Sequence, residues 1–237
     1  MAAIQPTVTP LTSINFLWLK VNREKFPFFS QQQAFVLSED ATFEDIFPTE
    51  NQKVIIDWMV EYPKSVCLYI DSRLLSETQA QTFKTGLKKL GIRYQEISEV
   101  LAGDPSIQSM DECIMQLETA VDVLPNIDIG FFIDYIKFEL AYHQALIAED
   151  DFCYVHSDFD YAPIPQKEIS ELTFSSGFKT SWKKYQQPEN DFFMLSDNHQ
   201  RTHPNLLAKI HPAYQEAMSK QLYLKLGTDR LFLEIYL

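Results

Sequence analysis

Two aspartates separated by one residue, Asp158 and Asp160, are the strongest candidates for chemistry in this chain. They follow a short apolar segment, residues 152–155 (FCYV), whose pattern predicts a buried strand. Two carboxylates this close in a partly buried site repel each other unless a cation lies between them. Mg²⁺ and Mn²⁺ favour oxygen ligands and keep positions for water and substrate phosphates. The spacing therefore indicates a divalent metal site for a diphosphate, and the alternative is a solvated acidic loop.

The segments before this motif predict an α/β fold with a mostly parallel sheet. Three apolar segments are typical of strands: residues 14–20, 65–70 and 92–97. Two helices separate them, and capping boxes are expected at their starts, Thr49 with Gln52 and Ser76 with Gln79. In such sheets ligands bind beyond the carboxyl ends of the strands, where Asp158 is expected.

A second pair of candidates, Asp134 and Lys137, lies on an apolar helix predicted over residues 131–147. Residues three apart on a helix share a face, so both side chains could point into one pocket or form an exposed ion pair. Further helices are expected at residues 106–122 and 204–220, and further strands at residues 192–195 and 231–236.

Composition limits the classes of function. The chain has 237 residues, 46% of them hydrophobic, which predicts a single domain over residues 1–237. A net charge of −13 opposes binding to nucleic acid or to an anionic membrane. The three cysteines are expected to be buried thiols in a reducing compartment. No segment has the length and apolarity of a transmembrane helix, so a soluble, cytoplasmic protein is expected.

Five stretches in order resemble the GT-A glycosyltransferases with a DXD sugar-binding region, which include the large clostridial glucosylating toxins and the fungal Golgi mannosyltransferases. They are INFLWLK (14–20), WMVEYPKSVCLYID (58–71), DYIKFEL (134–140), SDFDYAP (157–163) and ENDFFMLS (189–196), the last followed by His203-Pro204. The chain departs from the family pattern at Lys137, where the family has arginine, and at His156-Ser157, where it has Tyr-Leu. It also has Ala-Glu-Asp-Asp (148–151) where the family has Gly-Gly, and a longer spacing between Asp134 and Asp158.

The resemblance implies a GT-A fold, a Rossmann-like, mostly parallel sheet flanked by helices, and transfer of a hexose or N-acetylhexosamine. The donor would be a nucleotide sugar, with a UDP-sugar favoured, and the acceptor a protein or a glycan. Retention of anomeric configuration and a role as an effector secreted into a host cell are also implied.

The same resemblance assigns roles to individual residues. Mn²⁺ or Mg²⁺ would be held by Asp158 and Asp160. The residues implied to bind the nucleotide sugar are Trp18, Asp71, Asp134, Lys137 and Asp158, and those implied in catalysis are Asp134, Lys137, Glu189 and Asn190.

Structural alternatives remain for several of these residues. Trp18 could be an ordinary core aromatic, since tryptophan in an apolar strand usually packs. Asp71 could stabilise a turn after its strand, and Glu189 and Asn190 could cap a loop.

Two other functions are compatible with the sequence. One is a glycosyltransferase-like protein that binds without catalysis. The other is a phosphatase of the haloacid dehalogenase type, in which the first aspartate of D-x-D is a nucleophile. That family places the motif near the start of the chain, whereas here it lies two-thirds along.

Overall fold

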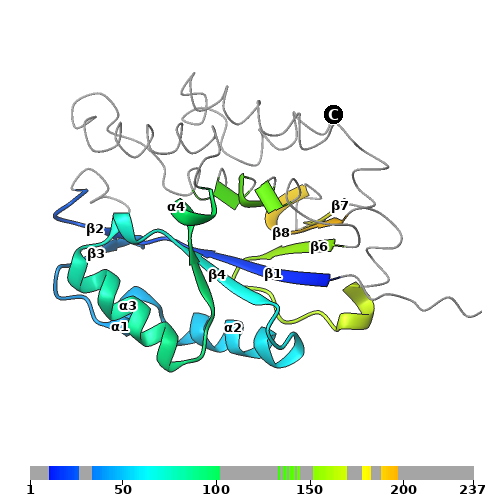
Figure 1. Cartoon of the computed structure of the whole chain (residues 1–237), viewed down its shortest axis with the longest axis horizontal. Helices are drawn as coiled ribbons and strands as arrows, with labels where there is room; N and C mark the ends of the chain where they lie inside the picture. The colour runs from blue at the N-terminus through cyan, green and yellow to red at the C-terminus, as the bar shows by residue number, and fades with distance from the viewer. Residues whose placement is uncertain are drawn as a thin grey trace, which may run out of the picture.

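A six-stranded sheet forms the centre of the computed structural model (Figure 1). The structure describes residues 11–26, 34–101, 133, 136, 137, 139–141, 143, 144, 152–169, 178–182 and 188–196. The strand order is β5-β4-β1-β6-β8-β7. Neighbours among β5, β4, β1 and β6 are parallel, whereas β8 is antiparallel to both β6 and β7. The sheet is therefore mostly parallel, as the sequence predicts.

The strands of this sheet are β1 (Leu11–Trp18), β4 (Val66–Ile70), β5 (Tyr94–Glu96), β6 (Phe152–Ser157), β7 (Phe178–Trp182) and β8 (Pro188–Ser196). A separate parallel pair is formed by β2 (Val21–Asn22) and β3 (Val36–Leu37). The helical elements are α1 (Phe43–Ile46), α2 (Thr49–Glu61), the short 3-10 helix η2 (Ser72–Leu74), α3 (Glu77–Lys89) and α4 (Ile97–Val100).

One face of the sheet is covered by α1, α2 and α3, which lie below it in Figure 1. Phe16 of β1 and Val155 of β6 are fully buried in a core shared with Trp58 of α2. The Trp58 indole also donates a hydrogen bond to the Tyr161 carbonyl at 3.1 Å. Because Tyr161 directly follows the D-x-D segment, α2 fixes the chain as it leaves the sheet.

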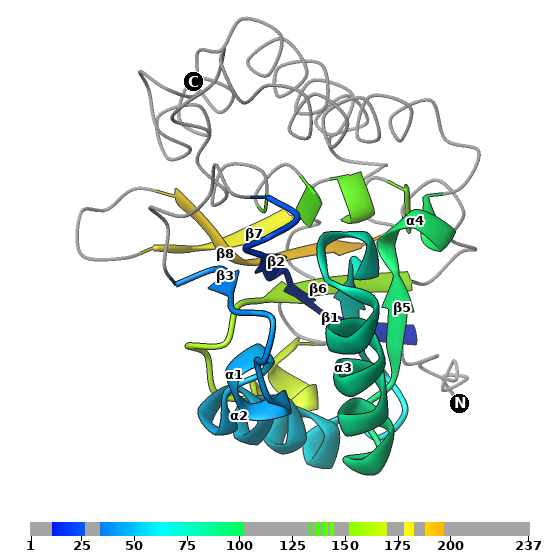
Figure 2. The ribbon, with the colours of Figure 1, turned by 90° about the vertical axis from the view of Figure 1, so that its left-hand side faces the viewer.

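The opposite face carries polar side chains and is covered by the described helical residues 133, 136, 137, 139–141, 143 and 144. Ile136, Leu140 and Ala141 are fully buried there. These short green segments lie above the sheet in Figure 1, and Figure 2 shows the same arrangement from the side. Strand residues on this face include Asn15 and His156, both buried. The helical expectation for this region is confirmed for the described residues.

Of the two capping boxes predicted at helix starts, one is confirmed and one is wrong. The capping box of Ser76 and Gln79 is present at α3. The predicted box of Thr49 and Gln52 is wrong, because Thr49 is already helical and Pro48 occupies the N-cap position without a side-chain cap. The Gln52 amide donates instead to the Phe47 carbonyl at 2.7 Å, which links α2 to the end of α1.

Several predicted boundaries change. The first strand covers Leu11–Trp18 instead of residues 14–20, and the last described strand, Pro188–Ser196, is longer than residues 192–195. The predicted elements at residues 106–122, 204–220 and 231–236 lie outside the described residues.

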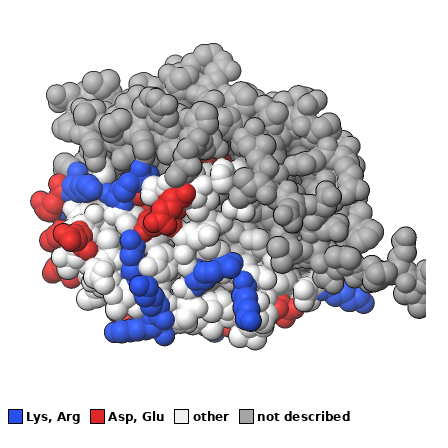
Figure 3. Space-filling view, in the orientation of Figure 1, with Lys and Arg blue, Asp and Glu red and all other residues white. Residues whose placement is uncertain are grey.

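The described surface is of mixed charge. Basic and acidic side chains both occur on the face drawn in Figure 3, and α3 contributes Lys88 and Lys89 in its last turn. Within the described ranges, no helix has the length and apolarity needed to cross a bilayer. Two cysteines, Cys67 and Cys153, are buried, and burial raises the pKa of the Cys67 thiol to about 11. Cys113 lies outside the described residues.

Candidate active site

Three of the residues singled out from the sequence lie at one edge of the sheet. Because β1, β4 and β6 run parallel, their carboxyl ends lie at the same edge. Trp18 is the last residue of β1, Asp71 follows β4, and Asp158 follows β6. In open α/β sheets this edge is where ligands bind.

Asp158 is held by two nitrogen donors. The Lys137 ammonium lies 2.8 Å from Oδ2, and Nε2 of His156 lies 3.1 Å from Oδ1. The side chains of Lys137 and His156 are 4% and 1% exposed, whereas that of Asp158 is 33% exposed. The two donors are therefore inside the protein, and the carboxylate they hold is partly exposed.

The charge state of Asp158 follows from these contacts. Burial by itself would raise the pKa of this carboxyl, but the hydrogen bond with His156 and the charge of Lys137 outweigh burial and lower the pKa below its ordinary value. The side chain is thus an anion at neutral pH. The Ser157 hydroxyl also donates to the Asp158 carbonyl at 2.9 Å, which further restrains the chain at this point.

Asp160 lies in the turn that follows and is exposed. Between the two aspartates, the ring of Phe159 packs into the core, with centroid distances of 5.0 Å to Phe16 and 5.2 Å to Trp18. This aromatic anchor fixes the position of the turn relative to β1. The D-x-D segment is consequently an ordered part of the sheet edge, which does not favour the reading as a loose, solvated loop.

The donor chemistry fits a divalent cation of the Mg²⁺ or Mn²⁺ type. Such ions are commonly bound by one or two carboxylates together with water and substrate phosphates. Asp158 is an anion whose oxygens each retain accepting capacity beyond one hydrogen bond. In the described part of the chain, no group of three or more His, Cys, Asp or Glu side chains could hold a metal. A site using Asp158 and Asp160 with substrate oxygens remains the prediction.

Trp18 has a clear packing role. Its indole Nε1 donates to the Ile46 carbonyl at 2.7 Å, and its ring packs edge-on against Phe47 and Phe159. The Lys20 ammonium lies 4.9 Å from the ring centroid. The ring thus belongs to the wall beside the D-x-D turn, and its stacking on a nucleobase stays a prediction.

Asp71 is used for local structure. Its side chain is 0% exposed, caps η2 by accepting from the Arg73 amide, and forms a bidentate pair with the Arg73 guanidinium at 2.9 and 2.7 Å. These contacts match the turn-stabilising alternative. A direct contact between Asp71 and a nucleotide sugar stays a prediction.

Glu189 and Asn190 lie in β8, and the pairing register fixes their place along the sheet. Ser157, the last residue of β6, pairs with Phe192. Because the two strands are antiparallel, the part of β8 before Phe192 extends past the end of β6, on the side of Asp158. The backbone of both residues is therefore at the same edge as Asp158, and their catalytic roles stay predictions. Asp134 lies outside the described residues.

His156 is a site residue to which the sequence analysis gave no role. Residues two apart along an extended chain project to the same side, so the position of His156 two residues before Asp158 was the available signal. The structure shows its ring stacked on Phe193, its cross-strand partner, at 5.1 Å and 18°.

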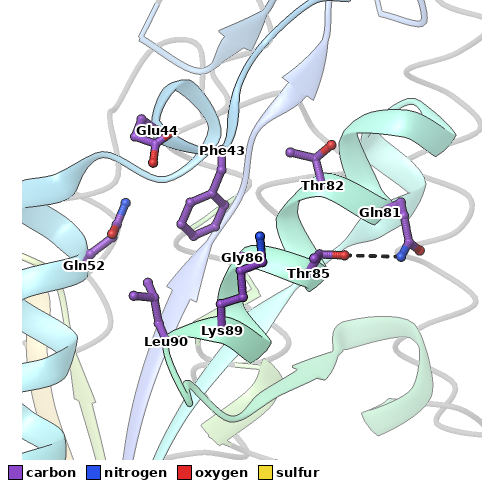
Figure 4. Close-up of a pocket in the computed structure, with 9 residues that line it drawn as sticks. All are labelled: Phe43, Glu44, Gln52, Gln81, Thr82, Thr85, Gly86, Lys89 and Leu90. Carbon is purple, nitrogen blue, oxygen red and sulfur yellow. Dashed lines mark hydrogen bonds between the residues drawn. The ribbon is translucent and has the colours of Figure 1, made fainter.

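A separate groove of about 550 Å³ lies between α1, α2 and α3 (Figure 4). It is lined by Phe43, Glu44, Gln52, Gln81, Thr82, Thr85, Gly86, Lys89 and Leu90. These residues belong to the helical face, and none of the catalytic, sugar-binding or metal-binding candidates from the sequence lines the groove. The groove is thus distinct from the sheet edge that carries Asp158.

Comparison with solved structures gives the type of fold. The structure titled "PaToxG Glycosyltransferase" superposes with a TM-score of 0.52 at 12% identity, covering 94% of this chain and 66% of that chain. The chain has the GT-A type of glycosyltransferase fold. It spans just under two thirds of the length of that structure.

A second similar structure is mouse xyloside xylosyltransferase 1 in its apo form. The TM-score is 0.43 at 8% identity, and the match covers 86% of this chain and 76% of that one. No protein-family model matches the sequence, and no curated protein matches it.

Proposed function

We propose that this chain is a metal-dependent glycosyltransferase that moves a hexose or N-acetylhexosamine from a nucleotide sugar to an acceptor. One observation carries the proposal: on a sheet of GT-A type, the first carboxylate of D-x-D is ordered at the carboxyl edge between Lys137 and His156. Asp158 is ionised and partly exposed, so it can meet a ligand from solvent.

The residues of this edge have distinct tasks in the proposed reaction. Asp158 and Asp160 would hold Mn²⁺ or Mg²⁺, which supplies charge stabilisation for a departing diphosphate. Lys137 keeps Asp158 in place, and its ammonium would help to orient the sugar of the donor as a point charge. Trp18 and Phe159 form the apolar wall beside them. Positioning and charge stabilisation of this kind do not require a covalent sugar intermediate.

The donor and acceptor are proposed from the sequence resemblance. UDP-sugars are favoured as donors, and the acceptor would be a protein or a glycan, with retention of configuration. The resemblance to the toxins favours a host protein as acceptor, which would make the chain a secreted effector. Asp134, Glu189 and Asn190 complete the proposed catalytic set.

The test is a donor panel with matched variants. Purified protein with Mn²⁺ is incubated with UDP- and GDP-sugars, and release of the nucleoside diphosphate is measured. Asp158→Asn and Asp160→Asn should each lower turnover of the accepted donor by roughly 100-fold or more, since they remove transition-state charge stabilisation. Asp57→Asn, the same change at an exposed position of α2, should leave turnover unchanged. Equal rates in all four proteins would remove the two aspartates from the mechanism.

An inactive, glycosyltransferase-like binding protein is a second candidate, because both Asp158 oxygens already have protein partners. Thermal-shift measurements distinguish the two, since a ligand that binds only the folded state raises the melting temperature. A shift with donor and Mn²⁺ but no turnover would favour the inactive protein. The phosphatase alternative lacks support, because the D-x-D follows the fourth strand of the main sheet in chain order, within a GT-A fold.

A further inference from the structure

His156 is built into the sheet in a way that restricts its ring. Its side chain is 1% exposed and stacks on Phe193 of the neighbouring strand at 5.1 Å and 18°. The β6–β8 register pairs the two residues directly. Because the ring plane is fixed, Nε2 can form a hydrogen bond only within a narrow region. Oδ1 of Asp158 lies in that region, 3.1 Å from Nε2.

The direction of this hydrogen bond is set by its partner. An ionised carboxylate only accepts hydrogen bonds, so Nε2 must carry the proton and donate it. Lys137 donates to the other oxygen, Oδ2, at 2.8 Å. Two buried donors on different elements therefore hold the two oxygens of one carboxylate, which fixes both its position and the rotation of its plane.

We propose that His156 is a positioning residue that orients the Asp158 carboxylate for the donor and its metal ion. This inference rests on the proposed function and adds to it a residue with an assigned task. Hydrogen bonds to a ligating carboxylate hold it in the orientation that the ion needs, and their loss commonly costs affinity or activity. His156 does not contact the reacting groups and acts through Asp158.

The rival explanation is that His156 only fills space against Phe193. The two explanations predict opposite results for two substitutions. His156→Phe keeps a ring for stacking and removes the donor. His156→Gln loses the ring but can place an amide N–H near the position of Nε2. Packing alone favours the phenylalanine variant, whereas positioning favours the glutamine variant.

The first experiment uses the full chain with Mn²⁺ and the accepted donor. His156→Phe should lower kcat by about 10–100-fold with a smaller change in KM, and weaken Mn²⁺ binding measured by electron paramagnetic resonance. His156→Gln should stay close to wild type in both measurements. Full activity and full Mn²⁺ affinity in His156→Phe would overturn the proposal. If that variant does not fold, His156→Asn replaces it, because its shorter amide cannot reach the Nε2 position.

The second experiment separates this inference from the proposed function. Crystal structures of the wild type and the variants show the orientation of the Asp158 side chain whether or not any donor is turned over. Asp158 should keep its orientation and its contact with Lys137 in His156→Gln, and should rotate or occupy several orientations in His156→Phe. An unchanged Asp158 in His156→Phe would overturn the positioning role. A wild type that turns over no donor would instead refute the proposed function.

Discussion

Loss of Asp158 should destabilise the protein more than loss of its ion-pair partner Lys137. The Lys137 side chain is 4% exposed, and that of Asp158 is 33% exposed. Asp158→Ala removes a counter-charge from a buried ammonium, which typically costs 3–5 kcal/mol in a fully buried pair. Because water reaches this pair on the Asp158 side, we expect Asp158→Ala to lower the free energy of unfolding by about 2–3 kcal/mol.

Lys137→Met should cost less, about 1 kcal/mol. The methionine fills a similar volume, and the carboxylate left behind keeps the His156 hydrogen bond and access to solvent. In the double variant no buried charge of this pair remains. The double variant should therefore lose less free energy of unfolding than the sum of the losses in the two single variants. The difference should be about 1–2 kcal/mol, as expected for residues in direct contact.

Urea unfolding of the four proteins at constant salt measures these values, provided that the m-values agree. Asp158→Ala should also lower the melting temperature by about 4–12 °C for a chain of this size. Asp57→Asn serves as the surface control and should stay within about 0.5 kcal/mol of wild type. Additive single costs, or a larger cost for Lys137→Met than for Asp158→Ala, would refute the buried ion pair.

Two further predictions concern the scaffold. A Cβ on Gly86 would lie 2.3 Å from the Phe43 ring, so Gly86→Ala should lower the free energy of unfolding by about 1 kcal/mol in urea unfolding. No further loss should appear when Phe43→Ala is already present, because alanine removes the ring atoms that clash. Burial opposes ionisation of the Glu96 carboxyl, but hydrogen bonds from Lys84 and Ser72 outweigh burial and lower the pKa of Glu96. The ionised Glu96 therefore stabilises the fold above pH 4.5, and this stabilisation is lost as the pH falls. Glu96→Gln should therefore be less stable than wild type at pH 7, with a difference that shrinks below pH 4.5; a difference independent of pH would contradict this assignment.

The features that local sequence patterns could predict are those governed by neighbouring residues. The continuous apolar segment of β4 is buried along its whole length. The α3 capping box and the end of that helix before Gly91, whose φ is 71°, also depend only on nearby residues. The prediction of a capping box at Thr49 was wrong because the local pattern resembles an N-cap. In the structure α2 contacts the end of α1, Pro48 is the N-cap and Thr49 is the first helical residue.

Features that depend on long-range pairing were missed or only partly predicted. β7 and the first residues of β8 gain their strand structure from pairing with each other across the edge of the sheet, and their sequence has no strong alternation. Asp158 and Lys137 were both implied to bind the nucleotide sugar, but their direct contact with each other requires a helix to lie across the sheet. The His156 ring needs a partner 37 residues later, Phe193, before its orientation is defined.

Lys137 and His156, two positions where the sequence differs from the motifs it resembles, contact the same carboxylate. An arginine fork can donate to both oxygens of a carboxylate, whereas a lysine ammonium acts as a point charge. Lys137 contacts Oδ2, and the remaining oxygen, Oδ1, is the one that His156 holds. A lysine alone would leave the carboxylate plane free to rotate about that single contact. The buried histidine therefore restores the second constraint that an arginine would provide, which explains why a lysine at this position is compatible with an ordered Asp158.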